Sequence, residues 1–390
     1  MLMILISMNL PDYKGGSIVN LMASIKKAFN GRHPYSELNL LPGCKLEGSK
    51  NIIVLTLDGL GSTFIKKHGA NTVFQRYKKG DITSVFPPTT GSAITTFLTG
   101  LPAQQSAIPG WNIFLKELGA VTTILRFKPL VGSSFEGIRI EDLLPCKGFT
   151  QDLNVNSYMI HPKEIMKSEF TKALGGKAEI KGYSKLNGLC KQINNSVKSN
   201  EQKKFIYAYW DGFDKIAHKY GVSSEESLNH FFQISKEIEK LINKLGGTNS
   251  KLIITADHGF IDTPRSRVIE LDDHPELQDC LVLPFCGDAR TIYCYVKPNK
   301  IKKFENYVKT HLNKFCDLYR SHDLIKKKAF GLYSPNKKLI ERIGDYVLIM
   351  KENYVFKDRP LGSIKKNKIG RHSGLTKEEM LVPLIYIETN

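Results

Sequence analysis

Short apolar runs, each followed by a polar or glycine-containing turn, recur along the chain and constrain its fold. Their β-branched and aromatic side chains show no polar alternation, which indicates strands buried on both faces. Helical patterns separate the runs, and strands alternating with helices predict an α/β fold with a mostly parallel central sheet and helices on both faces. The runs occupy residues 51–59, 82–86, 120–127, 203–212, 251–259 and 380–387.

The clearest helical pattern covers residues 223–247. Ser223 stands three residues before Glu226, as in a capping box, and Gly246 and Gly247 provide a stop. Residues 290–360 break the alternation of strands and helices. We therefore expect a core made of residues 1–289 and 361–390, with residues 290–360 inserted as a small cap subdomain.

The ends and the cysteines exclude several classes of protein. The first eight residues are apolar but lack a basic start and a cleavage site, so we expect a short strand and a cytoplasmic protein. No apolar run approaches the ~20 residues that cross a bilayer. The seven cysteines are scattered and contain no CxxC pair, which argues against a disulfide framework or a cysteine zinc site and favours buried free thiols.

The chain is strongly basic. Its 56 basic and 38 acidic residues give a formal charge of +18, which attracts anionic partners. The lysines are spread along the chain, without a helix-turn-helix or zinc-finger pattern, so nucleic-acid binding remains a minor, non-enzymatic alternative. The oligomeric state cannot be predicted from these features.

Carboxylates and histidines stand at the ends of several predicted strands. Asp58 ends the first run, and Asp257 and His258 end the fifth. Alone, an aspartate at a strand end such as Asp58 is more typical of a turn or a helix cap. Asp214 and His218 are four residues apart and share a face if their segment is helical. Asp211 competes with Asp214 for the same role, or caps that helix.

His372 lies between glycine-containing turns just before the last run, where a lone histidine is usually only exposed. The side chains at the carboxyl ends of parallel strands gather at one edge of the sheet, where ligands bind. We therefore expect two sets of three ligands, and a pair of metal ions about 3.5–4 Å apart is a known device for hydrolysing phosphate esters. The sets are Asp214, His218 and His372, and Asp58, Asp257 and His258.

The stretch "VFPPTTGSAITTFLTG" (85–100) places a hydroxyl pair before a predicted helix at 91–100. Thr90 is the candidate nucleophile and a further metal ligand, because the positive end of a helix favours an anion. An ordinary cap is the alternative, and Thr89 is then its structural neighbour. Gly91 would let a phosphate approach the backbone. Trp111 would stack against a substrate, although a tryptophan more often packs in a core.

The motifs "LTLDGLG", "VFPPTTGSAITTFLTGLPA", "YWDGFDKIAHKYG", "TADHGF" and "GRHSGLTKEEMLVPLI" together resemble the alkaline phosphatase superfamily, and most closely its nucleotide pyrophosphatase/phosphodiesterase branch. They run in family order from about residue 51 to 388. The resemblance implies an alkaline phosphatase-like fold, Thr90 as the nucleophile and two zinc ions. It assigns Asp214, His218 and His372 to the first metal and Asp58, Asp257 and His258 to the second.

These observations predict a metal-dependent phosphodiesterase or nucleotide pyrophosphatase that works through a covalent threonine intermediate. The predicted partner is a phosphorylated small molecule, possibly a nucleotide. Two divalent ions are expected, zinc first, although aspartate and histidine also accept manganese or iron. A phosphomonoesterase or a phosphonoacetate-type phosphonate hydrolase on the same site is the alternative. The CxPxR motif of sulfatases is absent.

Overall fold

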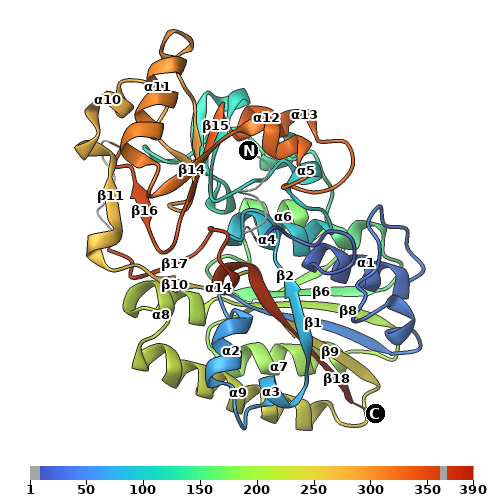
Figure 1. Cartoon of the computed structure of the whole chain (residues 1–390). Helices are drawn as coiled ribbons and strands as arrows, with labels where there is room; N and C mark the ends of the chain where they lie inside the picture. The colour runs from blue at the N-terminus through green and yellow to red at the C-terminus, as the bar shows by residue number, and fades with distance from the viewer. Residues whose placement is uncertain (1–8, 361–366, 390) are drawn as a thin grey trace.

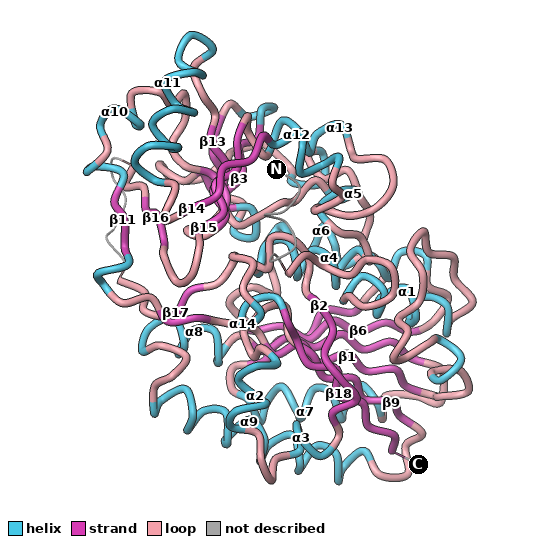
Figure 2. Tube along the Cα trace, in the orientation of Figure 1, coloured by secondary structure: helices cyan, strands magenta, loops and turns pink. Residues whose placement is uncertain are grey.

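The structure is a computed structural model that describes residues 9–360 and 367–389 (Figure 1). Residues 1–8, expected to form a short strand, lie outside the described residues. Within the described ranges, the strands form two seven-stranded sheets and two small two-stranded ones. Figure 2 shows the strands of the two large sheets as separate groups, one above the other.

The central sheet is mostly parallel, as predicted. Strands β9, β1, β8, β6 and β7 run parallel to one another, and β18 runs antiparallel to its neighbours β9 and β2. Every residue of β1 and of β8 is buried, which fits their continuous apolar sequences. The strand order is β2 (Lys78–Thr83), β18 (Leu381–Thr389), β9 (Ser250–Thr255), β1 (Asn51–Leu57), β8 (Lys204–Trp210), β6 (Asn156–Pro162) and β7 (Glu179–Tyr183).

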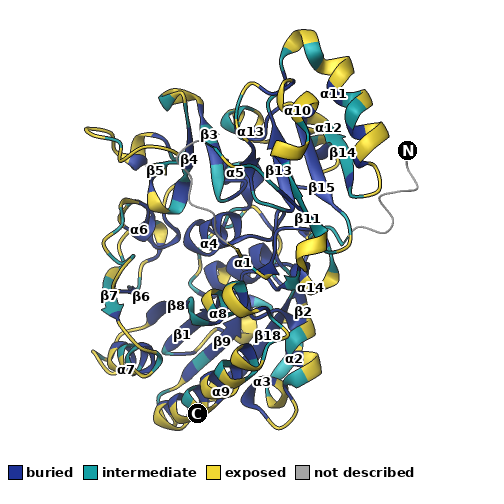
Figure 3. Ribbon diagram, turned by 90° about the vertical axis from the view of Figure 1, so that its left-hand side faces the viewer, coloured by how far each residue is buried: buried dark blue, intermediate teal, exposed yellow. Residues whose placement is uncertain are grey.

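Helices cover both faces of this sheet (Figure 1). One face carries α1 (Ile18–Ala28), α4 (Thr90–Thr99) and α6 (Glu169–Gly175). The other carries α2 (Ser62–His68), α3 (Val73–Arg76), α7 (Leu186–Val197) and α9 (Glu225–Leu245). In Figure 3 the central strands are buried, whereas the outward side of α9 is exposed. The predicted α/β fold with helices on both faces is therefore confirmed.

The N-cap of helix α9 lies one residue later than predicted. Ser224 is the N-cap, and its hydroxyl accepts a hydrogen bond from the Ser227 N–H at 3.2 Å. Ser223 is engaged elsewhere, because its N–H donates to Asp262 Oδ2 at 3.0 Å. The prediction of Ser223 as the cap was therefore wrong. The predicted stop was right, since Gly246 ends the helix.

The second sheet is antiparallel throughout and combines two distant segments. The interpretation of residues 120–127 as a strand of the central sheet was wrong, because residues 120–123 pair with the strands on either side of them in the second sheet. The order is β14 (Cys316–Arg320), β15 (Tyr346–Met350), β13 (Thr291–Cys294), β12 (Cys286–Gly287), β3 (Asn112–Leu115), β4 (Ala120–Thr123) and β5 (Lys128–Pro129).

Strand β15 shows how the second sheet is buried on both faces. Tyr346, Leu348 and Met350 pack into one hydrophobic cluster, which includes residues of α11 (Ile301–Tyr307). Val347 and Ile349 point the opposite way, as alternation along a strand requires. Their cluster includes residues of α12 (Ser321–Lys326) and α13 (Lys337–Arg342). The division into a core and an inserted subdomain at residues 290–360 stays our proposal.

The second sheet packs directly against the segments that lead into the carboxyl edge of the central sheet. Phe86, Leu375 and Met380 belong to the same hydrophobic cluster as Tyr293 and Val347. Shorter elements complete this region: α5 (Ala103–Ser106), α8 (Gly212–Tyr220), α10 (Pro275–Gln278), α14 (Lys377–Met380), β10 (Ile261–Asp262), β17 (Gly370–Arg371), β11 (Val268–Glu270) and β16 (Val355–Lys357).

Two expectations concern the chain as a whole. All seven cysteines lie in the described ranges and are unpaired, and five of them are buried. Among the helices of the described residues, none has the length and apolar character that a bilayer crossing requires.

Candidate functional site

The predicted ligands emerge at one edge of the central sheet. Asp58 directly follows β1, the pair Asp257 and His258 follows β9 after one residue, and α8 follows β8. Thr90 comes after β2. Because β18 runs antiparallel to its neighbours, the segment that enters it, with His372, lies at this same edge.

Asp58 is held by the neighbouring strand. Its N–H donates to the Trp210 carbonyl at 2.8 Å, and its Oδ2 accepts a hydrogen bond from the Tyr209 hydroxyl. Gly59 follows with φ +76°, and a Cβ there would lie 2.3 Å from the Phe260 ring. The turn that places Asp58 at the sheet edge therefore requires a glycine.

Asp257 and His258 form a fully buried pair. The Oδ1 of Asp257 accepts from the Gly59 and His258 N–H groups, each at 3.0 Å, so its Oδ2 is left to face the site. His258 Nδ1 lies 3.1 Å from the Gly259 carbonyl, which can only accept. Nδ1 therefore carries the proton, and Nε2 presents its lone pair. That Nε2 lies 3.4 Å from Oδ1 of Asp58 and from Oδ2 of Asp257.

Helix α8 supplies the next two predicted ligands. His218 Nε2 lies 3.4 Å from Asp214 Oδ1, as the spacing of four residues predicts. His218 Nδ1 faces the Gly370 carbonyl at 2.9 Å, so the ring again turns Nε2 toward the carboxylate. Asp211 is the N-cap residue, and its carboxylate pairs with Lys215 at 2.7 Å. The structure thus places Asp214, and not Asp211, among the other predicted ligands.

His372 lies against both His258 and His218. Its ring stacks on that of His258, with centroids 3.8 Å apart and an angle of 17°, and it lies 5.1 Å from the His218 ring. Phe260 packs edge-on against His218 and His372. Within the described residues, the buried Nδ1 of His372 has no hydrogen-bond partner.

Thr90 begins α4, one residue earlier than predicted, with Thr89 as the N-cap residue. The Thr90 hydroxyl lies 3.2 Å from His258 Nε2 and donates to it. The side chain of Thr89 makes no capping hydrogen bond. The first N–H groups of a helix have no partner within it, so the start of α4 adds an anion-attracting end to the cluster.

Gly91 is needed for packing at this helix start. A Cβ at Gly91 would lie 2.3 Å from the Gly110 carbonyl oxygen and 3.0 Å from the Trp111 nitrogen. The backbone of Trp111 therefore lies directly beside the first turn of α4. The Trp111 N–H donates to Asp288 Oδ2 at 3.1 Å, and the Arg126 guanidinium lies 5.9 Å from the Trp111 ring centroid.

Burial opposes charge on the acids and bases of the cluster. It raises the pKa of Asp58, which the neighbouring Asp257 and Asp214 raise further, and it raises the pKa of Asp214 to about 6. Burial also lowers the pKa of His218 to about 2 and that of His372 well below its ordinary value. A divalent cation would reverse the cost of ionising the carboxylates, and neutral imidazole is the form that binds metal.

The donor atoms fit a pair of cations. Three buried carboxylate oxygens, Asp58 Oδ1, Asp214 Oδ1 and Asp257 Oδ2, have no hydrogen-bond partner among the described residues. Buried polar atoms are normally paired, so such a cluster points to an ion. Two groups have donor atoms within 4.8 Å of one another: Asp58, Asp257 and His258, and Asp214, His258 and His372. The cluster is compatible with a bimetal site. His258 belongs to both groups, and His218 lies beside the second.

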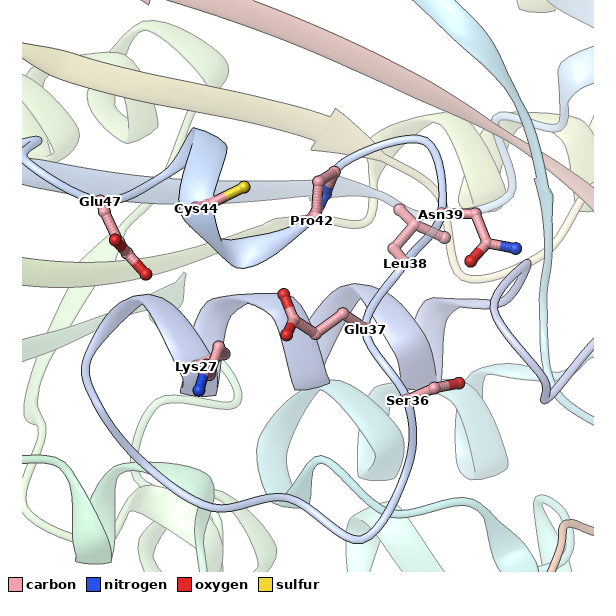
Figure 4. A pocket seen from close by; sticks show the side chains of 8 residues that line it. All are labelled: Lys27, Ser36, Glu37, Leu38, Asn39, Pro42, Cys44 and Glu47. Atoms are coloured by element: carbon pink, nitrogen blue, oxygen red, sulfur yellow. The ribbon is translucent and has the colours of Figure 1, made fainter.

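Two side chains at the site carried no signal in the sequence. Tyr209 donates to Asp58 across 151 residues of chain, and Asp288 accepts from Trp111 across 177. Asp288 lies between β12 and β13 of the second sheet, which sequence patterns did not connect to α4. A pocket between α1 and residues 36–47 lies apart from this site (Figure 4). None of the predicted site residues lines it.

Comparison with known proteins agrees with this geometry. The family model of type I phosphodiesterase / nucleotide pyrophosphatase matches residues 52–375. Over 96 residues the chain is 33% identical to human Bis(5'-adenosyl)-triphosphatase ENPP4. This stretch covers 23% of the chain and only 20% of that relative's length.

Solved structures share the fold. Murine ENPP5 superposes with a TM-score of 0.65 at 16% identity, over 85% of this chain and 87% of that one. Phosphonoacetate hydrolase from Sinorhizobium meliloti gives 0.63 at 14% identity, over 87% and 90%. Since the family model spans most of the chain, the protein belongs to the type I phosphodiesterase / nucleotide pyrophosphatase family of the alkaline phosphatase superfamily.

Proposed function

We propose that this protein hydrolyses a phosphodiester or pyrophosphate bond of a nucleotide, with Thr90 as the nucleophile and two divalent cations as cofactors. The observation that carries the proposal is the position of the Thr90 hydroxyl. It lies at the start of α4 and 3.2 Å from His258 Nε2, inside a cluster of buried donors that lack partners. Family membership supports the same chemistry.

Each cation has a set of ligands in the proposal. Asp58, Asp257 and His258 would hold one, and Asp214, His218 and His372 the other. When bound, the ions would acidify a hydroxyl and neutralise charge on the leaving oxygen. Imidazole and carboxylate donors suit zinc, and manganese and iron accept the same donors.

The residues of the chain supply the remaining steps. Thr90 Oγ1 gives its proton to solvent and bonds to phosphorus, while the bond from phosphorus to the leaving oxygen breaks and the leaving group departs with that electron pair. N–H groups at the start of α4 stabilise the phosphoryl oxygens during this step. Water then cleaves the threonine ester, which returns the Thr90 hydroxyl and releases the phosphorylated product.

A nucleotide is the proposed substrate class. The name of ENPP4 describes a Bis(5'-adenosyl)-triphosphatase, and ENPP5 has been solved with AMP as an inactive variant in which a threonine is replaced by alanine. In this chain Trp111 is half-buried beside the first turn of α4, where its ring could stack on a base. The protein would then bind the phosphate at α4 and the base at Trp111.

The test is turnover of a nitrophenyl phosphodiester and a panel of nucleotides, after chelation and after restoring zinc, manganese or iron. Thr90→Ala should lower kcat by at least about a thousandfold, as loss of a nucleophile does elsewhere. Thr99→Ala, at the other end of the same helix, is the matched control and should keep the parent activity. A Thr90→Ala protein as active as the parent would refute the proposal. Faster turnover of monoesters or phosphonates would favour the alternative hydrolase.

A further inference from the structure

Tyr209 contacts a predicted ligand without being one itself. Its hydroxyl donates to Asp58 Oδ2, whereas Asp58 Oδ1 has no hydrogen-bond partner among the described residues. That free oxygen lies 3.4 Å from His258 Nε2. Thus one oxygen of the Asp58 carboxylate accepts from the Tyr209 phenol, and the other faces the His258 imidazole.

The fold leaves Tyr209 little freedom. Tyr209 pairs in register with Thr56 where β8 runs parallel to β1, and its side chain reaches Asp58, two residues further along that chain segment. The Asp58 N–H donates to the carbonyl of Trp210, the next residue, and the Tyr209 carbonyl accepts from the Tyr183 hydroxyl at 2.6 Å. Only 5% of Tyr209 is exposed. Both partners of the hydrogen bond are therefore fixed by the two central strands.

We infer that Tyr209 is a positioning residue, which holds Asp58 with Oδ1 turned toward a cation. The inference rests on the proposed function, because it takes Asp58 to be a metal ligand. Asp58 is buried near two other carboxylates, Asp257 and Asp214, so repulsion would turn it away in the absence of a donor. Hydrogen bonds to the outer oxygen of a ligating carboxylate orient it, and their loss typically costs 10–100-fold in metal affinity.

Tyr207 provides a matched control. It lies two residues earlier on β8, on the same face, and is as deeply buried as Tyr209. Its ring stacks on Phe97 with centroids 5.9 Å apart. Its hydroxyl lies beside Thr56 and has no carboxylate partner among the described residues. Tyr207→Phe therefore removes one phenol oxygen from the same strand without removing a hydrogen bond of Asp58.

The experiment measures metal binding and not turnover. Purified parent, Tyr209→Phe and Tyr207→Phe proteins are stripped of metal and titrated with Zn²⁺ against a chelator of known affinity. Tyr209→Phe should bind one of its two ions 10–100-fold more weakly and keep the other. Tyr207→Phe should match the parent. If Tyr209→Phe binds both ions as the parent does, the inference is wrong.

Two further measurements separate other causes. In an Asp58→Asn background, Tyr209→Phe should leave the affinity for the remaining ion unchanged, because residues that act through one another are not additive. A further loss of affinity there would mean a general structural role and would overturn the inference. A parent protein that binds fewer than two ions would refute the proposed bimetal function itself, a result distinct from an unchanged variant.

Discussion

Replacement of Arg290 by methionine should destabilise the protein more than any exposed charge removal. Arg290 and Glu379 are both fully buried and form a two-pronged pair, Nε to Oε1 at 2.7 Å and Nη2 to Oε2 at 3.0 Å. Arg290 also donates to the carbonyls of Glu352 and Tyr354. Removing one partner leaves a carboxylate buried without its counter-charge, which costs about 3–5 kcal/mol of free energy of unfolding.

The double variant Arg290→Met/Glu379→Met tests whether the missing charge partner is the cause. Apolar replacement of a whole buried pair is often neutral. Here Glu379 also accepts from the Gly374 N–H at 2.7 Å and the Thr376 hydroxyl at 2.9 Å, and losing each bond costs about 1 kcal/mol. Both variants also lose the two bonds from Arg290 to main-chain carbonyls, so these cancel in the comparison. We therefore expect the double variant to be about 1–3 kcal/mol more stable than Arg290→Met, because the unpaired charge costs more than the bonds of Glu379.

The measurement is equilibrium unfolding of the metal-free proteins in urea, followed by far-ultraviolet circular dichroism. Arg76→Met is the control, because Arg76 forms a solvent-exposed pair with Glu239 at 3.1 Å, and its urea midpoint should match the parent's. Unfolding of Arg290→Met at the parent's urea midpoint would contradict the stabilising role of the buried pair. A double variant less stable than Arg290→Met would show that the missing counter-charge is not the cause.

Three smaller changes test other parts of the structure. Gly91→Ala brings a Cβ within 2.3 Å of the Gly110 carbonyl oxygen and should lower kcat/KM on a nitrophenyl phosphodiester by roughly a hundredfold; parent-like kinetics would contradict this. Burial lowers the pKa of His161 to about 4, so the unfolded chain binds the extra proton as the pH falls from 6.5 to 4. His161→Phe should therefore lose about 3 kcal/mol less stability than the parent over that window, measured by urea unfolding at each pH, and an equal loss would count against it. Ser224→Ala should cost about 1 kcal/mol and Ser223→Ala little, and equal urea midpoints would mean that the cap is assigned wrongly.

The central sheet could be predicted because each of its strands is recognisable from its own residues. Strands buried on both faces have continuous apolar sequences, and a turn follows each one. A parallel sheet brings all its carboxyl ends to one edge, so Asp58 and Asp257 could be expected near each other although they are 199 residues apart. The i, i+4 spacing of Asp214 and His218 is local in the same sense.

The second sheet could not be predicted, because the tendency of a segment to form a strand does not show which other strand it pairs with. Residues 120–127 have a strand-like composition wherever they pair. Their sheet joins the strands of residues 286–350 through β12 and β3, where Gly287 pairs with Asn112. The serines at 223 and 224 are equivalent in sequence, and only the distant Asp262 distinguishes them. The Tyr209–Asp58 bond likewise depends on strand register that no local pattern contains.

Glu379 of α14 links the second sheet to the site. Its side chain pairs with Arg290, which directly precedes β13 of the second sheet, and accepts from the Gly374 N–H, two residues after His372. Its main-chain carbonyl accepts from the Gly259 N–H at 2.8 Å, directly after His258. The two stacked histidines are therefore anchored through the same glutamate. A displacement of Arg290 should therefore disturb both histidine loops, so weakened packing in the second sheet should affect both members of the stacked pair.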